Sequence, residues 1–294
     1  MTNAIETHGL TKDYGNGHGI FDLDVAVTEG EVFGYLGPNG AGKTTTLKIL
    51  MGLIHASRGG ATIFGLDVDR DAVALKKRIG YVPGELPQFG GWRGAEIVGY
   101  VAGLRGDVPA DKVELIAKRL DLDLGRKYRE YSHGNKQKLA LLLAFAPEPA
   151  LLIVDEPTTG LDPLHQQVFQ ALVQEAKARG ATVLISSHVL SEVEQVCDRV
   201  GIVREGHLAT VGPIDQLTGI KAHHVAIDFA GAPPIDRLRA LPGFEQVTLE
   251  GSRVRGLYRG SFDPLLAAIS GSPVTSLTSR EPSLEEIFLS YYSA

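Results

Sequence analysis

The sequence is poor in cysteine, because Cys197 is the one thiol among 294 residues. A single thiol excludes a disulfide within the chain and fits a protein of a reducing compartment. A buried structural role is more common for such a residue than a reactive one. Positive charge is not in excess either, since the formal net charge at pH 7 is −6. We therefore expect no nucleic-acid partner held through phosphate contacts.

Long hydrophobic runs are also missing. The most continuous apolar run, residues 139–146, is well short of the ~18–20 residues that a membrane-spanning helix needs. The first residues, MTNAIETHGLTKDYG, lack the charged and apolar regions of a signal peptide. We expect a cytoplasmic protein without direct membrane insertion, whose role at a membrane would depend on a partner.

Up to about residue 218, apolar strand patterns alternate with helical patterns, which is typical of an α/β domain with a largely parallel sheet. Near-continuous apolar runs at 31–37, 151–157 and 182–188 predict strands that are covered on both faces. Helical spacing is found at residues 43–53, 94–104, 110–120, 136–146, 163–179 and 189–197.

A second block of the sequence begins near His224. Its patterns predict the order βαββαβ, followed by an amphipathic helix in SLEEIFLSYY, residues 283–292. That order is compatible with a small ferredoxin-like or related α+β domain. We therefore expect two domains, residues 1–219 and 220–294.

The segment GPNGAGKTT, residues 37–45, matches the phosphate-loop pattern G-x-x-x-x-G-K-[ST] directly after a predicted strand and before a predicted helix. Glycines let backbone N–H groups converge on phosphate oxygens, and the helix start adds its positive end. Lys43 is expected to reach the β- and γ-phosphates, and Thr44 to bind Mg²⁺. The expected nucleotide-binding residues of this loop are Gly37, Pro38, Asn39, Gly40, Ala41, Gly42, Lys43, Thr44 and Thr45.

The segment LLIVDEP, residues 151–157, has two acidic residues, Asp155 and Glu156, directly after its apolar run. Asp155 can hold Mg²⁺, usually through water, and Glu156 can orient or deprotonate the attacking water. Because successive strand residues point to opposite faces, the two carboxylates are unsuited to sharing a proton. The sequence therefore predicts separate roles for them.

Ser132 and His133 stand side by side in EYSHGNKQKL, residues 130–139. Adjacency in sequence does not make a nucleophile and its base, because that chemistry depends on geometry. The segment directly precedes the apolar helix pattern that leads to the Asp-Glu strand. The function of this segment has to be inferred from its place in the order of motifs.

The order of motifs over residues 1–218 resembles that of the ATP-binding subunits of ABC transporters. The family's signature, L-S-G-G-Q, corresponds here to Tyr131, Ser132, His133, Gly134 and Asn135. The resemblance implies that Ser132 caps a helix beginning near residue 136 and binds the γ-phosphate of an ATP held by a partner subunit. Ser132 is then a phosphate ligand and not a nucleophile.

The same resemblance implies a P-loop NTPase fold of ABC type. Such a fold has a mixed, largely parallel sheet with helices, an antiparallel β subdomain and a helical subdomain, here at about residues 85–147. Within that subdomain, Phe89 and Trp92 would contact a permease or fill the subdomain's core.

Three further residues stand at positions that have known roles in the family. Asp162, in TGLDP, corresponds to the D-loop at the dimer seam, and His188, in SSH, to the switch histidine near the γ-phosphate or attacking water. Tyr14 corresponds to the aromatic residue that stacks on adenine. Taken alone, a histidine after a strand is more often structural, and an exposed tyrosine near a turn is common. The order of the motifs favours the functional roles.

The sequence departs from the family pattern at two places. His133 and Asn135 replace glycine and glutamine in the signature, so a ring stands where the family has no side chain. Gly84, in YVPGELPQ, occupies the place of the Q-loop glutamine. Glu85, Gln88 or a water molecule could take over that amide's contacts.

The forms VPGE and S-x-G-N-K-Q-K, and the tail SREPSLEEIFLSYY, resemble bacterial exporters of drugs, antibiotics and other lipophilic compounds. The resemblance implies an ATPase with ATP and Mg²⁺ as ligands. Its partners would be a second copy or a homologous subunit, and a separately encoded permease at the inner face of the cell membrane. Two alternatives remain: a soluble ABC ATPase without a transport role, and a weakly hydrolysing regulatory subunit. The first would call for two ATPase halves or a coiled-coil insertion.

Overall fold

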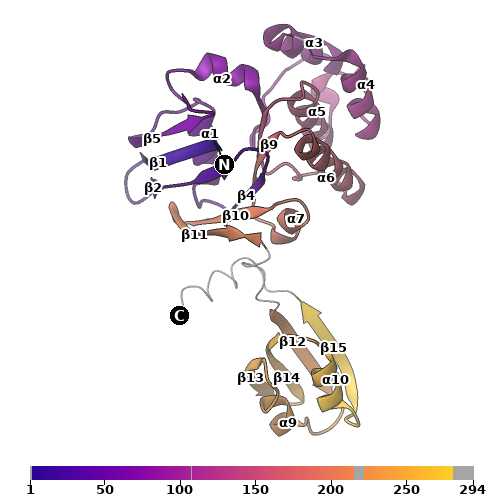
Figure 1. Cartoon of the computed structure of the whole chain (residues 1–294). Helices are drawn as coiled ribbons and strands as arrows, with labels where there is room; N and C mark the ends of the chain where they lie inside the picture. The colour runs from indigo at the N-terminus through magenta and orange to yellow at the C-terminus, as the bar shows by residue number, and fades with distance from the viewer. Residues whose placement is uncertain (1, 107, 215–221, 281–294) are drawn as a thin grey trace. The chain divides into compact units, whose positions relative to one another are not determined.

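The structure is a computed structural model that describes residues 2–106, 108–214 and 222–280 (Figure 1). The chain divides into two compact units, residues 1–214 and 215–294. The domain boundary expected near residue 219 and the helix expected at 283–292 lie outside the described residues.

The central sheet of the first unit carries the chemistry-bearing segments. Its strand order is β11-β10-β4-β9-β8-β7, and all neighbours are parallel except the hairpin of β10 and β11. Every side chain of β4, β8 and β9 is buried, as the near-continuous apolar runs predict. The bounds are β4 Val32–Leu36, β7 Ile79–Val82, β8 Leu151–Asp155, β9 Thr182–Ser187, β10 Arg199–Arg204 and β11 His207–Pro213.

A second sheet in this unit is antiparallel, with the order β2-β1-β5-β6 and β3 paired to β1. Its apolar face and the central sheet share one core, in which Ile5, Phe33 and Leu47 are fully or almost fully buried. The bounds are β1 Asn3–Asp13, β2 Gly19–Leu23, β3 Ala26–Thr28, β5 Arg58–Ile63 and β6 Leu66–Asp67. This is the antiparallel β subdomain that the resemblance implies.

Helices α3, α4 and α5 gather on the side of the central sheet away from β1, β2 and β5 (Figure 1). Helix α5 begins at His133 and not near residue 136, because Ser132 itself is the N-cap. The bounds are α1 Lys43–Leu50, α2 Ala72–Arg78, α3 Gly94–Arg105, α4 Ala110–Arg119, α5 His133–Phe145, α6 Pro163–Ala178 and α7 Leu190–Glu194, with the 3₁₀ helix η1 at Tyr128–Glu130. Within the described ranges, none of the helices combines the length and apolar character needed to cross a bilayer.

The second unit has the predicted element order βαββαβ. All its strand pairs are antiparallel, in the order β13-β14-β12-β15, and Ile227, Val254 and Tyr258 lie in its own core. This topology supports a ferredoxin-like arrangement as a proposal for this unit. The bounds are β12 Ala222–Phe229, α9 Ile235–Arg239, β13 Phe244–Glu250, β14 Arg253–Arg259, α10 Asp263–Ile269 and β15 Val274–Arg280.

Candidate functional site

The phosphate loop connects β4 to α1, so it leaves the carboxyl end of the central sheet and opens a helix. Gly40 and Gly42 have φ values of 83° and 103°, in the left-handed region that favours glycine. A Cβ on Gly42 would collide with the side chain of Ile20 at the start of β2. The glycines therefore set the loop's path and let the β1–β2 hairpin close against it.

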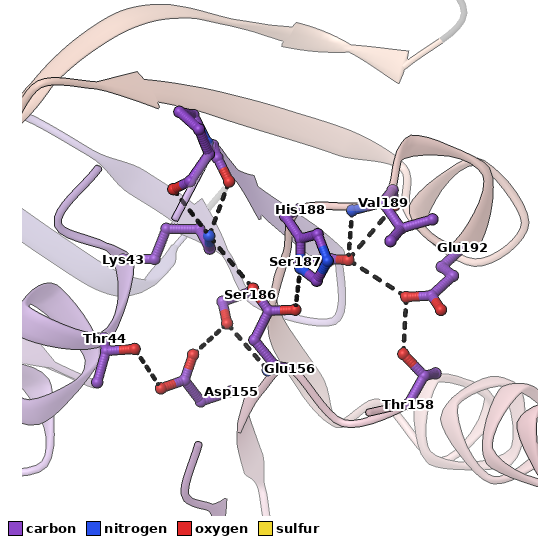
Figure 2. A network of polar contacts seen from close by, with 12 residues as sticks. Lys43, Thr44, Asp155, Glu156, Thr158, Ser186, Ser187, His188, Val189 and Glu192 are labelled. Carbon is purple, nitrogen blue, oxygen red and sulfur yellow. Dashed lines mark hydrogen bonds and ion pairs between the residues drawn. The ribbon is translucent and has the colours of Figure 1, made fainter. Parts of the chain in front are cut away.

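The Lys43 side chain crosses this loop and is 5% exposed. Its Nζ donates to the carbonyl oxygens of Gly37 at 2.7 Å and Pro38 at 3.3 Å, and lies 3.2 Å from Glu156 Oε1 (Figure 2). Two carbonyls and one carboxylate thus compensate the buried ammonium group. The N–H groups of the Lys43 ammonium can instead donate to the oxygens of a phosphate bound at the loop.

Asp155 lies at the end of β8 and is fully buried. Its carboxylate accepts hydrogen bonds from Thr44 Oγ1 at 2.7 Å and from Ser186 Oγ on the neighbouring strand (Figure 2). Strand pairing places Asp155 opposite Ser186, which explains the second contact. The Thr44 hydroxyl and the Asp155 carboxylate therefore place their oxygen atoms side by side at the start of α1.

These two oxygens suit Mg²⁺. Mg²⁺ usually keeps several waters and takes only one or two protein oxygens together with substrate phosphates. A cage of three or more His, Cys, Asp or Glu side chains, which is absent from the part of the chain that the structure describes, is therefore not required.

Glu156 directly follows the last residue of β8, and its carboxylate contacts other residues than that of Asp155 does. Its Oε2 lies 2.7 Å from Nδ1 of the half-exposed His188, and its Oε1 faces Lys43. The backbone of Glu156 is left-handed, with φ 49°, and its N–H donates to the carbonyl and hydroxyl oxygens of Ser186. A non-glycine residue in that region is held by its surroundings, so the carboxylate is fixed between Lys43 and His188.

The signature segment forms a separate surface at the start of α5. Ser132 is exposed, and its Oγ accepts a hydrogen bond from Asn135 N–H at 3.2 Å. A Cβ on Gly134 would lie 2.6 Å from the carbonyl oxygen of Gly160, and one on Gly160 would lie 2.5 Å from Cδ2 of His133. The His133 ring therefore packs against the D-loop of its own chain.

Asp162 caps α6 by accepting from the backbone N–H of His165 at 3.0 Å and facing its Nδ1 at 2.7 Å. These hydrogen bonds, the backbone one foremost, lower the pKa of Asp162 below its ordinary value. The expected D-loop carboxylate thus has a partner within its own helix.

Tyr14 is 58% exposed at the turn between β1 and β2, with Lys12 Nζ 5.5 Å from its ring centroid. The strand that follows this turn begins with Gly19 and Ile20, which lie against Gly42 of the phosphate loop. Tyr14 is thus an exposed aromatic ring on the hairpin that packs against the phosphate loop.

Gly84, at the Q-loop position, lies against the buried carboxylate of Asp155. A Cβ on Gly84 would be 2.7 Å from Asp155 Oδ2, the oxygen that accepts from Thr44. Burial, followed by the charges of Asp155 and Glu85, raises the pKa of the neighbouring Tyr81 to about 12. The close approach of the Gly84 backbone to the Asp155 carboxylate gives a physical reason for glycine at this position.

Sequence reasoning missed three side chains that the structure brings into the site. Ser186 holds Asp155 and the N–H of Glu156, while Thr158 and Glu192 form a hydrogen-bonded link beside them. The SSH motif contained Ser186, but its partner on β8 depends on strand register.

The fold and this constellation define a P-loop nucleotide-binding protein. The ABC transporter family model matches residues 20–159. The bacitracin transport ATP-binding protein BcrA of Bacillus licheniformis is 38% identical, covering 74% of this chain and 72% of that protein. The daunorubicin resistance ATP-binding protein DrrA3 of Streptomyces coeruleorubidus is 32% identical, covering 97% and 95%. A solved ATP-binding subunit of an ABC transporter superposes with a TM-score of 0.68 at 29% identity, covering 74% of this chain and 92% of that one.

The chain belongs to the ABC transporter family and is one of its ATP-binding, ATP-hydrolysing proteins. The fold class that the motif order implied is confirmed by the family match and the solved relative.

Replacing Gly84 with alanine is expected to lower Mg²⁺-dependent ATP turnover roughly tenfold, because the new Cβ displaces the Asp155 carboxylate or the loop. The matched control is Gly91→Ala in the same loop, where a Cβ meets open space. Steady-state hydrolysis by the two variants measures the effect. Equal turnover in Gly84→Ala and Gly91→Ala would contradict a tight contact between Gly84 and Asp155.

Proposed function

We propose that this chain is the ATP-hydrolysing subunit of an exporter and drives a separately encoded permease for a drug, antibiotic or other lipophilic compound. Two copies, or one copy and a homologous subunit, enclose two ATP molecules. Each ATP lies on the phosphate loop of one chain and under the Ser132 loop of the other. The similarity to a bacitracin transport ATP-binding protein and a daunorubicin resistance ATP-binding protein supports the substrate class.

The observation that carries this proposal is the contact set of Lys43, Glu156 and His188. Glu156 bridges a cation beside the phosphate loop and an imidazole at the end of β9, with distances of 3.2 and 2.7 Å. When ATP is bound, Lys43 turns to the phosphates and Glu156 becomes free to accept a proton from the attacking water. His188 holds Glu156 or the water in place.

Mg²⁺ would be held by Thr44 and, through water, by Asp155, and when bound it neutralises charge on the phosphate oxygens. Ser186 keeps the Asp155 carboxylate turned toward Thr44. Tyr14 would stack on the adenine. Thr44, Asp155 and Ser186 already lie together at the carboxyl ends of the central strands, and Tyr14 comes from the β1–β2 turn.

The Ser132 loop supports a site shared by two chains. It presents a serine hydroxyl and the N–H groups of a helix start, which is an anion-binding arrangement. Ser132 is exposed, and the residues after it pack on the D-loop of their own chain. A phosphate on a second copy is the ligand that fits it.

The helical subdomain offers a face for the permease. Trp92 and Tyr100 are 44% and 53% exposed, with ring centroids 5.4 Å apart. Beside them an apolar hollow of about 300 Å³ is lined by residues that include Phe89, Tyr128 and Leu139. The chain's location at the inner face of the membrane would follow from docking there.

The test is ATP hydrolysis by the full chain with and without its permease in lipid vesicles. We expect hydrolysis that the permease raises and that a transported lipophilic compound raises further. Hydrolysis that no membrane partner changes would favour a soluble ABC ATPase. ATP binding without hydrolysis in either condition would favour a regulatory subunit, and both results would contradict the proposal.

A further inference from the structure

Glu192 connects the two loops that carry the catalytic pair. Its Oε2 accepts from Thr158 Oγ1 at 2.7 Å and from Ser187 Oγ at 3.2 Å (Figure 2). Thr158 follows Glu156 by two residues, and Ser187 directly precedes His188. One carboxylate therefore joins the turn after β8 to the end of β9.

This link runs beside the contact of Glu156 with His188. The register pairs of β8 and β9 end at Asp155 and Ser186, and one further backbone hydrogen bond runs from the N–H of Glu156 to the carbonyl oxygen of Ser186. Beyond that bond the side chains of Glu156 and His188 join the two loops, and Glu192 joins them a second time. The Glu156–His188 contact alone would let the loops rotate about it. The second link, through Glu192, restricts that rotation.

The hydroxyl groups at both ends of the link are buried. Thr158 is 7% exposed and Ser187 is 1% exposed. Ser187 Oγ also accepts from the N–H of Val189 at 2.9 Å, so the backbone just after His188 is held by the same chain of bonds. Removing the carboxylate leaves two buried hydroxyls without their charged acceptor.

Helix α7, which carries Glu192, packs on strand β4. The next residue, Val193, is 1% exposed and packs over Gly34 of β4, where a Cβ would collide with its methyl group. Strand β4 leads directly into the phosphate loop. The position of Glu192 is thus set by the strand that carries the loop, although Glu192 does not touch the nucleotide site itself.

A third contact extends the link toward the signature segment. The buried Gln137 side chain on α5 donates to the carbonyl oxygen of Pro157 at 2.9 Å. The turn at 156–158 is therefore held from three directions: by His188, by α5 and by Glu192.

We propose that Glu192 is a positioning residue for ATP hydrolysis: it ties Thr158 to Ser187 and so keeps Glu156 and His188 aligned when Lys43 turns to the phosphates. This proposal rests on the proposed function of Glu156 and His188. Its role is to preserve the alignment of the attacking water, and a displacement of such groups by about 1 Å can cost roughly 10²-fold in rate.

The test is a set of variants of the full chain. Glu192→Ala is expected to lower kcat about 10- to 10²-fold with little change in the KM for ATP. Glu192→Gln keeps an amide oxygen that can accept one hydroxyl, so its kcat should lie between those of Glu192→Ala and the wild type. Glu175→Gln, an exposed helical glutamate paired with Arg119, is the matched control and should keep the wild-type kcat.

Thr158→Val removes the other end of the link. If the two groups act through each other, Thr158→Val combined with Glu192→Ala should be no slower than Glu192→Ala alone. Effects that multiply would contradict the proposal. So would a wild-type kcat in both Glu192 variants, or a fall in thermal midpoint and ATP binding with kcat unchanged.

Hydrolysis by the wild-type chain distinguishes a failure of the proposed function from a failure of the positioning role of Glu192. A wild-type chain that hydrolyses no ATP contradicts the proposed function. An active wild type whose kcat is insensitive to Glu192 contradicts only the positioning role.

Discussion

Glutamine in place of Glu156 is expected to lower ATP turnover by about 10²–10⁴-fold while nucleotide binding persists, as is typical for loss of a general base. The amide has nearly the same shape as the carboxylate but cannot take the proton of the attacking water. It can still accept from His188, so the local geometry is largely retained. Removing one negative charge beside Lys43 should strengthen the binding of ATP.

The measurement is single-turnover hydrolysis of bound ATP together with equilibrium binding of the nucleotide. Glu114→Gln, an exposed glutamate on α4, is the control and should behave as the wild type. Hydrolysis at the wild-type rate by Glu156→Gln would show that another group accepts the proton. Loss of ATP binding would show that Glu156 serves the loop's structure instead.

The second large effect is expected at Ser132. Aspartate there should prevent ATP-driven pairing of two chains and lower turnover on the order of 10²-fold or more. Aspartate is as good an N-cap as serine, so α5 should stay intact. Its charge would face the γ-phosphate, and two like charges about 4 Å apart repel by about 4 kcal/mol at an effective dielectric constant of about 20.

Ser132→Asn is the matched control, because asparagine has the size and capping ability of aspartate without its charge. Light scattering with ATP, in chains that also carry Glu156→Gln, reports pairing. Thermal unfolding checks that all variants are folded. If Ser132→Asp and Ser132→Asn paired equally well, the charge at this position would not face a phosphate.

Contiguous motifs made much of the site predictable from the sequence. The phosphate loop, Asp155 and His188 stand directly at strand ends, and the carboxyl ends of parallel strands meet at one edge of a sheet. Their proximity follows from strand order alone. The buried strands were predictable because both of their faces are covered and their sequences are apolar throughout.

Contacts that depend on tertiary packing were not predictable in this way. Helix α5 begins three residues before the apolar pattern starts, because its first turn, His133 to Asn135, is polar and is fixed by the Ser132 cap. The packing of His133 on Gly160 and of Gly84 on Asp155 depends on how separate loops meet. No spacing in the sequence indicates the link of Thr158, Ser187 and Glu192, because these residues come from the turn after β8, from β9 and from α7.

The most direct test of the shared site is a mixture of two inactive chains, one Lys43→Ala and the other Ser132→Asp. In a mixed pair, one site contains both defects, and the other combines an intact phosphate loop with an intact Ser132 loop. One of the two sites in each mixed pair is intact, so turnover should recover well above that of either variant alone, to at most about half of the wild-type value if the sites act independently. Turnover that stays at the level of the separate variants would contradict an ATP site built from two chains.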